Sequence, residues 1–278
     1  MEDTPVYKIV KKEVLNQAVI LMDVEAPYVS ARCEAGQFVI VRLGEDGERI
    51  PLTIADFDRE KNTVTIVFQT VGYSTKQMGK LEVGDGFDDF VGPLGKPAPF
   101  EKWDRVVGIA GGVGAAPLYP QLKKLSEQGV RCDVIIGGRS AEFVILAEKF
   151  KEFCENVYIM TDDGSLGEKG FGVDKLKELV ANGEKYDHAI AIGPLIMMKF
   201  VVLATKEMNL PTAVSLNPIM IDGTGMCGGC RVTVGGETKF ACVDGPDFDG
   251  FLVDFDECMK RQTFFKEEEH ECMMKMGE

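Results

Sequence analysis

The chain has 278 residues, of which 27% are charged and 45% hydrophobic, and its net charge is −14. This length suits two or three domains, and the balance is that of ordinary globular proteins. The acidic charge argues against binding to nucleic acid or to an anionic membrane surface. The polar residues 1–5 and the lack of an apolar run of bilayer length predict a cytoplasmic protein, neither secreted nor membrane-spanning.

Residues 1–100 have the pattern of a small all-β barrel. Short apolar or β-branched runs, separated by turn signals, predict strands over residues 6–10, 18–22, 37–42, 49–53 and 63–68. A short helix is predicted over residues 75–80, and residues 83–86 predict a turn into a last strand. Closely spaced strands of this kind are typical of a barrel.

From Trp103 onward, predicted strands alternate with predicted helices. A buried strand over residues 104–110 leads into the glycine-rich turn Gly111-Gly-Val-Gly114. This order predicts βαβ units and a parallel sheet. Further strands are predicted over residues 131–137, 157–160, 188–192 and 212–216, and helices over residues 118–128, 147–154, 173–182 and 195–208. The turn is not a complete dinucleotide fingerprint, but glycines at a helix N-terminus suit a pyrophosphate.

Three cysteines and one aspartate are spaced like the ligands of an iron–sulfur cluster. Asp222 stands five residues before Cys227, Cys230 follows three residues later, and Cys242 comes after a predicted hairpin. This is the plant-type [2Fe–2S] spacing C-x4-C-x2-C with a distant cysteine, and Asp222 takes the first cysteine's place. The many intervening glycines suit a loop around a cluster, because glycine brings backbone N–H groups close at positive φ. Zinc is the main alternative, although no histidine is near; buried free cysteines are a third possibility.

After Gly250 the composition changes to a charged segment. Residues 253–272 predict a helical tail with aromatic residues that could pack on the body or on another subunit. Cys258, His270 and Cys272 lack a usual metal-ligand spacing. Cys258 nevertheless stays open as a fourth cluster ligand if Asp222 only caps a turn. The isolated Cys33, Cys132 and Cys154 are interpreted as plain core or surface thiols.

The barrel, the nucleotide-type domain and the cysteine loop, in this order, resemble the ferredoxin–NADP⁺ reductase superfamily. The resemblance is narrower to its electron-transfer subunits that carry FAD and a C-terminal [2Fe–2S] cluster. These include the subunits of dihydroorotate dehydrogenase B, of sulfide dehydrogenase and of the electron-bifurcating NADH-dependent ferredoxin:NADP⁺ oxidoreductase. The aspartate at position 222 resembles the small subunit of the last of these enzymes. The resemblance implies an FAD-binding barrel (residues 1–100), an NAD(H)-binding α/β domain (residues 101–217) and a [2Fe–2S] domain with a helical tail (residues 218–278).

The resemblance also implies which barrel residues hold the FAD. The family's Arg-x-Tyr/Ile-Ser/Thr motif falls on residues 50–53, with Ile50 in the arginine position and Arg49 one place earlier. Neighbouring side chains of a strand point to opposite faces, so this departure leaves the role of Arg49 open. The expected FAD-binding residues are Ile50, Pro51, Leu52, Thr53, Val67, Phe68, Gln69, Gly72, Ser74 and Thr75.

In the second domain the resemblance implies a dinucleotide site and an electron path. With one basic residue, Arg139, and Glu142 close by, NAD(H) is favoured over its phosphorylated form. The expected NAD(H)-binding residues are Gly111, Gly112, Val113, Gly114, Ala116, Pro117, Gly138, Arg139, Ser140, Asp162, Asp163, Gly193 and Pro194, and the expected cluster ligands are Asp222, Cys227, Cys230 and Cys242.

The function that the resemblance implies is electron transfer within a complex. A hydride from NAD(H) would pass to FAD, and single electrons through the [2Fe–2S] cluster to or from a larger flavin and [4Fe–4S] subunit that serves ferredoxin. No side chain is expected to act as acid or base. Two alternatives remain: the electron-transfer subunit of an NAD-dependent dihydroorotate dehydrogenase, and a non-enzymatic metal-binding scaffold.

Overall fold

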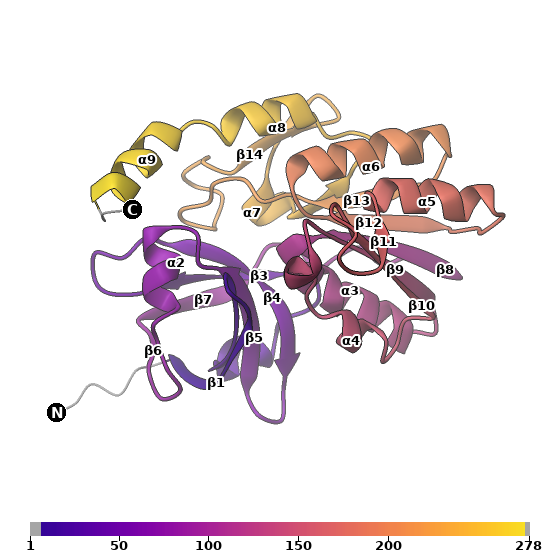
Figure 1. Cartoon of the computed structure of the whole chain (residues 1–278). Coiled ribbons are helices and arrows are strands. Elements are labelled where there is room, and N and C mark those ends of the chain that lie inside the picture. Colours follow the sequence, from indigo (N-terminus) through magenta and orange to yellow (C-terminus); the bar gives the residue numbers. More distant parts are fainter. Residues whose placement is uncertain (1–6, 276–278) are drawn as a thin grey trace.

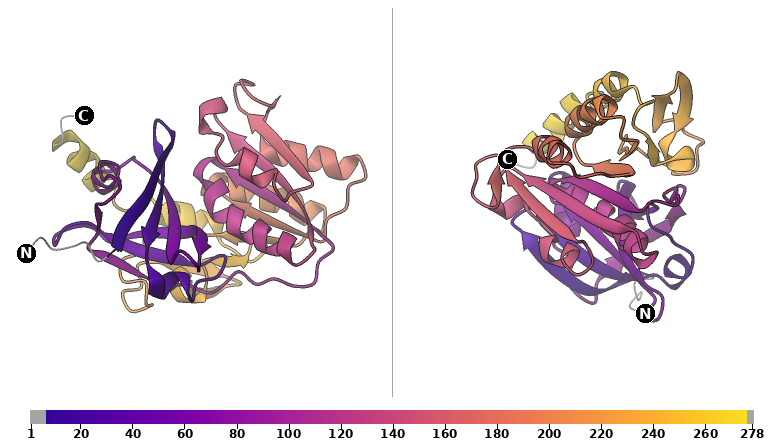
Figure 2. Two further views of the ribbon diagram at one scale, coloured as in Figure 1. Left: turned by 90° about the horizontal axis from the view of Figure 1, so that it is seen from below. Right: turned by 90° about the vertical axis from the view of Figure 1, so that its right-hand side faces the viewer.

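A computed structural model describes residues 7–275 of the chain. An antiparallel barrel and a helix-covered parallel sheet lie side by side, and the C-terminal elements lie across one end of both (Figures 1 and 2). This is the order of architectures that the sequence predicts.

The first part of the described chain is an antiparallel, nearly closed barrel sheet. Its strand order is β6-β1-β2-β5-β4-β3-β7. The strands are β1 (Tyr7–Asn16), β2 (Val19–Glu25), β3 (Phe38–Arg42), β4 (Ile50–Asp58), β5 (Thr63–Gln69), β6 (Gly86–Phe87) and β7 (Asp89–Leu94), with helices α1 (Pro27–Ser30) and α2 (Tyr73–Met78). The predicted first strand lies in β1 except for Val6, which is outside the described residues. Side chains such as Met22, Ile54 and Phe90 fill the barrel.

The second part is a parallel sheet with helices on both faces. The sheet order is β11-β10-β9-β8-β12-β13-β16, and its last strand runs antiparallel. Helices α3 and α4 pack on one face, and α5 and α6 on the other (Figure 1). The elements are β8 (Arg105–Gly111), η1 (Gly112–Gly114), α3 (Ala115–Glu127), β9 (Arg131–Gly138), η2 (Ala141–Phe143), α4 (Ala147–Phe150), β10 (Asn156–Thr161), β11 (Glu168–Lys169), α5 (Gly172–Ala181), β12 (His188–Ile192), α6 (Leu195–Glu207) and β13 (Thr212–Ser215).

The C-terminal part adds a hairpin, an edge strand and the tail helices. They are β14 (Arg231–Val234), β15 (Glu237–Phe240), α7 (Ala241–Asp244), β16 (Asp247–Asp249), α8 (Phe255–Arg261) and α9 (Lys266–Lys275). Strand β16 joins the sheet of the second part beside β13, so residues after 217 complete that sheet. Within residues 7–275, no helix combines the length and apolar character needed to cross a membrane.

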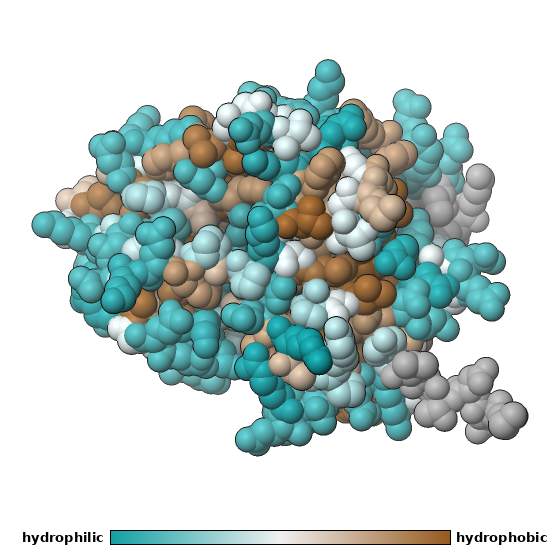
Figure 3. All heavy atoms as spheres, turned by 180° about the vertical axis from the view of Figure 1, so that it is seen from behind, coloured by the Kyte–Doolittle hydropathy of each residue, from teal (hydrophilic) through white to brown (hydrophobic). Residues whose placement is uncertain are grey.

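Helix α3 connects the barrel to the parallel sheet. Barrel residues Val19, Leu21 and Val67 share a hydrophobic cluster with it, and Lys123 Nζ lies 3.0 Å from Asp56 Oδ1 across the junction. The two parts therefore share a packed core. Viewed from behind, most of the surface is hydrophilic and many exposed apolar side chains gather near its middle (Figure 3).

Three helices differ by two residues or more from the sequence prediction. Helix α2 (Tyr73–Met78) begins and ends two residues before the predicted range 75–80. Helix α3 begins at Ala115, three residues early, because the 3₁₀ turn over Gly112–Gly114 leads directly into it. Helix α4 ends at Phe150, whereas the prediction ran to residue 154. The predicted strands of the parallel sheet are all present, since each is a buried apolar run that helices cover on both sides.

Candidate cofactor sites

Asp222 organises the loop of residues 220–230, hereafter the cluster loop. Its Oδ1 accepts a hydrogen bond from the N–H of Thr224 (2.9 Å), and its Oδ2 accepts from the N–H groups of Met226 (3.1 Å) and Cys227 (2.7 Å). These bonds, that of Thr224 first, hold the pKa of Asp222 below its usual value. Gly223 and Gly225 take positive φ angles of 76° and 83° within this turn, as glycine allows.

The four predicted cluster ligands lie in two adjacent pairs. Asp222 is bonded to the backbone of Cys227, and the N–H of Cys242 lies 3.4 Å from Cys230 Sγ. Cys227 is exposed, whereas Cys230 and Cys242 are buried. Burial and then the neighbouring Cys230 thiol raise the pKa of Cys242 to about 12. In the part of the chain that the structure describes, no three His, Cys, Asp or Glu side chains converge as a ready-made metal site.

The chemistry of these residues fits an iron–sulfur cluster. Three sulfurs and a carboxylate come from one glycine-rich loop and the hairpin that follows it. Backbone N–H groups already face the sulfurs: Gly229 N lies 3.4 Å from Cys227 Sγ, and the N–H of Cys242 faces Cys230. Hydrogen bonds to sulfur tune the potential of such clusters. The assignment of the four residues as ligands stays a prediction.

Cys258 lies apart from the buried cysteine pair. It packs in α8 within the hydrophobic cluster of the parallel sheet, whereas Cys230 and Cys242 pack with barrel residues. His270 is exposed on α9, and the side chain of Cys272 is outside the described ones. The cap that Asp222 forms is the interaction expected of a residue that closes a turn, and the same carboxylate lies beside Cys227.

The cluster loop packs directly on the barrel. Met220, Cys230 and Cys242 share a small hydrophobic core with Phe38 and Ile40 of β3. A Cβ on Gly223 would lie 2.7 Å from Ile40 Cδ1, so the loop backbone touches the strand. The Arg49 Nε donates to the carbonyl of Ile221 at 2.8 Å. The strand predicted to hold the flavin and the loop predicted to hold the cluster are thus adjacent.

The predicted flavin strand presents alternate residues to the two sides of the barrel wall. Ile50 and Leu52 pack into the barrel core, whereas Ala55 faces the cluster around α3. Since side chains of a strand alternate, Pro51 and Thr53 face the second domain with Ala55. Arg49 lies just before β4 and contacts Asp89 of β7 and the carbonyl of Ile221.

Not every predicted flavin residue has a free side chain. Phe68 is 2% exposed in the barrel core, and Val67 packs toward α3. The Thr75 hydroxyl accepts from the N–H of Gly72 at 3.1 Å, which closes the start of α2. The Ser74 hydroxyl instead donates to the carboxylate of Glu48. An anion therefore already accepts a hydrogen bond where an FAD phosphate oxygen is expected.

A cavity of about 280 Å³ lies next to that contact. The end of β3, the loop before β4, the first residue of β4 and helix α2 line it. Its lining includes Asp46, Glu48, Ile50, Tyr73, Ser74 and Gln77. Gln69, the last residue of β5, is half-buried and precedes α2 by four residues in the sequence. The structure thus brings Ile50 and Ser74 together around one cavity.

The glycines of the turn after β8 have different tasks. A Cβ on Gly114 would lie 2.2 Å from the carbonyl oxygen of Ile192, and one on Gly193 would lie 3.0 Å from Gly111 Cα. These glycines let the turn and the loop after β12 touch. Gly112 has a φ of 54°, and a Cβ added to it would meet no atom within 4 Å. Its backbone therefore faces open space and is free to approach a ligand.

The other predicted dinucleotide residues gather at the carboxyl edge of the parallel sheet. The N–H of Asp162 donates to Gly138 O at 3.1 Å and that of Asp163 to Arg139 O at 3.3 Å, so two turns meet there. Asp163 Oδ1 accepts from Ser165, which lowers the pKa of Asp163. Val113 and Ala116 pack in the core with α3, Pro117 is partly buried in α3, Ser140 lies beside Glu142, and Pro194 is exposed. Ligands of open α/β sheets bind at this edge.

Sequence analysis missed two groups at these sites. Arg261, at the end of α8, donates from Nη2 to the carbonyl of Gly229 at 3.1 Å. Asp247 on β16 has a buried Oδ1 without a hydrogen-bond partner among the described residues, while Gln121 Nε2 donates to its Oδ2 at 2.8 Å. Neither contact leaves a local signal, because the partners are far apart in sequence.

Comparisons with known proteins agree on one family. A family model described as the iron–sulfur cluster binding domain of dihydroorotate dehydrogenase B matches residues 217–254. A protein of Thermotoga maritima, named a homolog of the dihydroorotate dehydrogenase B (NAD(+)) electron transfer subunit, is 45% identical over 97% of this chain and 95% of its own. The electron transfer subunit of Fusobacterium nucleatum is 33% identical over 81% of this chain and 88% of its own.

Solved structures extend the likeness to the whole chain. A structure of the NADH-dependent reduced ferredoxin-NADP oxidoreductase, studied for flavin-based electron bifurcation, aligns with a TM-score of 0.93 and 43% identity and covers 100% of both chains. A ferredoxin NADP+ reductase of Neisseria gonorrhoeae aligns with a TM-score of 0.58 and 16% identity, over 73% of this chain and 90% of its own. The second likeness shows a shared fold.

Proposed function

Because this chain belongs to the family of dihydroorotate dehydrogenase B electron-transfer subunits, we propose that it is the small subunit of an NADH-dependent ferredoxin–NADP⁺ oxidoreductase. It exchanges hydride between NAD(H) and FAD and relays single electrons through a [2Fe–2S] cluster. The observation that carries this proposal is the full-length match to that enzyme's structure. The packing of the cluster loop on β3, which pairs with the predicted flavin strand β4, supports it.

The residues of this chain hold and separate the reactants. When bound, the cofactors supply the conversion of a two-electron hydride into single electrons. Thr53 and Pro51 would present the flavin-facing wall of β4, and Ser74 would donate to the FAD diphosphate in place of its hydrogen bond to Glu48. Gly112 brings backbone close to the dinucleotide pyrophosphate. Asp222, Cys227, Cys230 and Cys242 hold the cluster.

NAD(H) is the proposed dinucleotide of this subunit. Arg139 is the basic residue of the turn after β9, and its side chain is exposed. Glu142 Oε1 lies 3.5 Å from Ser140 Oγ in the same turn. A carboxylate there accepts hydrogen bonds from ribose hydroxyls and repels a 2′-phosphate. Replacing Glu142 by Gln should narrow the preference for NADH over NADPH.

A larger subunit is the proposed electron partner. As an electron-transfer subunit, the chain works within a multi-subunit complex. The partner that we propose carries flavin and [4Fe–4S] clusters and serves ferredoxin, in the cytoplasm. The proposed domains are residues 1–100, 101–217 and 218–278, with β16 crossing back into the second.

The second candidate is the electron-transfer subunit of an NAD-dependent dihydroorotate dehydrogenase. The family model over residues 217–254 and the names of several relatives favour it. The residue at position 222 distinguishes the two candidate functions. The dihydroorotate dehydrogenase B subunits are expected to bind the cluster with four thiolates, whereas this chain has Asp222 in place of the first cysteine. Oxidation of dihydroorotate by the purified complex would support this second function.

One anaerobic purification tests both candidates. The native complex is isolated through this chain, its partner polypeptides are identified, and flavin and iron are counted per subunit. We expect flavin and two irons on this chain, and we expect NADH to reduce the flavin and the cluster. The complex should show NADPH- and ferredoxin-linked activity. A chain that copurifies with no flavoprotein and binds no iron would overturn the proposal.

A further inference from the structure

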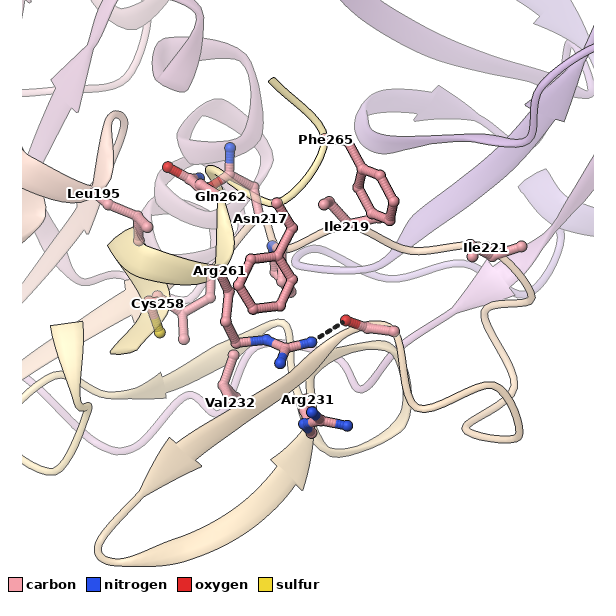
Figure 4. A pocket seen from close by; sticks show the side chains of 14 residues that line it. Leu195, Asn217, Ile219, Ile221, Arg231, Val232, Cys258, Arg261, Gln262 and Phe265 are labelled. Atoms are coloured by element: carbon pink, nitrogen blue, oxygen red, sulfur yellow. Dashed lines mark hydrogen bonds between the residues drawn. The ribbon is translucent and has the colours of Figure 1, made fainter. Parts of the chain in front are cut away.

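Two arginine side chains reach the cluster loop from opposite sides. Arg49, just before β4, donates from Nε to Ile221 O at 2.8 Å. Arg261, at the end of α8, donates from Nη2 to Gly229 O at 3.1 Å (Figure 4). The two carbonyls belong to the residues that immediately precede Asp222 and Cys230. The barrel thus holds the start of the loop, and the tail holds its end.

Each arginine is itself fixed by its surroundings. Arg49 Nη1 lies 3.8 Å from Asp89 Oδ2, and Arg42 Nε lies 2.5 Å from the same carboxylate oxygen. Because Arg42 takes the closer position, Asp89 neutralises Arg49 only in part. Arg261 lies over the ring of Phe264, 5.2 Å from the ring centre. Each guanidinium group therefore has a second contact besides the loop carbonyl.

Apolar side chains line the side of the loop that Arg261 reaches. A cavity of about 150 Å³ separates α8 from the loop, and its lining is mostly apolar: Ile219, Ile221, Val232, Phe264 and Phe265 contribute to it. Figure 4 shows Arg261 reaching along this cavity to the loop backbone. Its bond spans 32 residues of sequence, and that of Arg49 spans 172.

We infer that Arg49 and Arg261 are positioning residues that clamp the cluster loop and raise the reduction potential of the cluster held there. The inference rests on the proposed function. Reduction adds negative charge beside Asp222 in a protein whose net charge is already −14. Two nearby guanidinium groups stabilise the reduced form more than the oxidised form, and hydrogen bonding around a cluster sets its potential.

The experiment compares full-length wild type, purified without oxygen, with R49M, R261M, R49K and R231M. Arg231 is the matched control: it follows Cys230 directly and is exposed, and its guanidinium has no hydrogen bond to the described residues. The cluster potential is measured by redox titration with electron paramagnetic resonance. Loop opening is measured by hydrogen exchange of peptides that cover residues 219–231.

R49M and R261M should lower the cluster potential and speed exchange of the loop about fivefold, while the flavin absorbance stays that of wild type. R49K should keep most of the potential, because it keeps the charge. R231M should leave loop exchange unchanged. Wild-type potential and exchange in both R49M and R261M would overturn the inference; if R49M does not fold, the potential and exchange of R261M decide it.

Failure of the proposed function gives a different result. Wild-type protein without iron would refute the cluster, but the exchange comparison would still show whether the arginines hold the loop. If R49M and R261M bind iron and keep the cluster potential and loop exchange of wild type, the clamp is refuted and the proposed function is not.

Discussion

Asp222 combines two tasks that are usually divided between residues. Its carboxylate accepts three backbone N–H bonds from the turn that leads to Cys227, which keeps it ionised. An ionised carboxylate held at this place is ready to serve as an oxygen ligand. The same side chain therefore shapes the loop and supplies negative charge to it.

Substitution of Asp222 tests these tasks together. D222A should lower the iron affinity at least about tenfold, because the loop loses its cap and the site loses an oxygen donor. D222C should retain iron but change the electron paramagnetic resonance spectrum, since sulfur replaces oxygen. Iron per polypeptide and the spectrum of the reduced protein are the measurements.

Cys258 provides the matched control for this prediction. It is buried in α8, away from the cysteine pair, and C258A should keep the iron content of wild type. Loss of iron in C258A together with its retention in D222A would make Cys258 the fourth ligand and Asp222 a cap.

Asp247 should make stability depend on pH in a way that one substitution removes. Burial raises its pKa from 3.8 to about 6, and Oδ1 is shielded from solvent without a partner among the described residues. An acid whose folded-state pKa is raised destabilises the fold above that pKa, and this cost disappears as the pH falls through 6 toward 3.8.

D247N should therefore be more stable than wild type at pH 7.5, by on the order of 1–3 kcal/mol. The difference should shrink at pH 5. Denaturant unfolding at both pH values measures it. D249N, an exposed change on the same strand, should show no such pH dependence. A pH-independent difference for D247N would contradict the assigned charge.

At the scale of elements, the glycine turn after β8 separates a packing role from a binding role. Gly114 is needed where the turn touches Ile192, whereas Gly112 faces open space. G114A should destabilise the protein strongly, because its Cβ meets a backbone carbonyl at 2.2 Å that cannot move aside cheaply. Thermal unfolding measures this loss.

G112A is the companion variant. Its positive φ costs roughly 1 kcal/mol in stability, but its main effect should be a higher KM for NADH if the turn receives the pyrophosphate. Steady-state reduction of an artificial acceptor by NADH measures it. Equal KM values for G112A and wild type would remove Gly112 from the site.

The sequence predicted the elements that carry their own periodicity and missed those that depend on distant partners. The strands of the barrel and parallel sheet, the helix after Gly114 and the hairpin before Cys242 all follow local patterns. Strand β16 does not follow a local pattern. It is three residues long and forms because it pairs with the edge strand β13 of the parallel sheet. The contacts of Arg49 and Arg261 escaped for the same reason, since only the folded chain brings them to the cluster loop.

At the scale of the whole molecule, the cluster loop lies where the three parts meet. The barrel contacts it through β3 and Arg49, the hairpin supplies Cys242, and the tail reaches it through Arg261. The parallel sheet joins through Phe248 of β16, which packs against the small core of the loop. Such an arrangement places the predicted electron outlet next to the predicted flavin strand without a separate linker.

The tail beyond this junction has little support from the chain itself. Each residue of α9 (Lys266–Lys275) whose side chain is described is exposed, and Phe264 and Phe265 before it are 52% and 50% exposed. An isolated helix of this length is marginal in water. Contact with the larger subunit would give it the missing packing.

Truncation tests this expectation. A chain that ends at Phe265 should unfold at the same temperature and hold the same iron and flavin as wild type, because the removed side chains that are described bury nothing. Its affinity for the larger subunit should fall about tenfold or more, since interface helices concentrate binding free energy in few contacts. Quantitative copurification with the tagged partner measures this. Truncated and full-length chains that bind the partner equally would assign the tail to solvent, whereas loss of iron or of stability on truncation would show that α9 supports the body of the subunit instead.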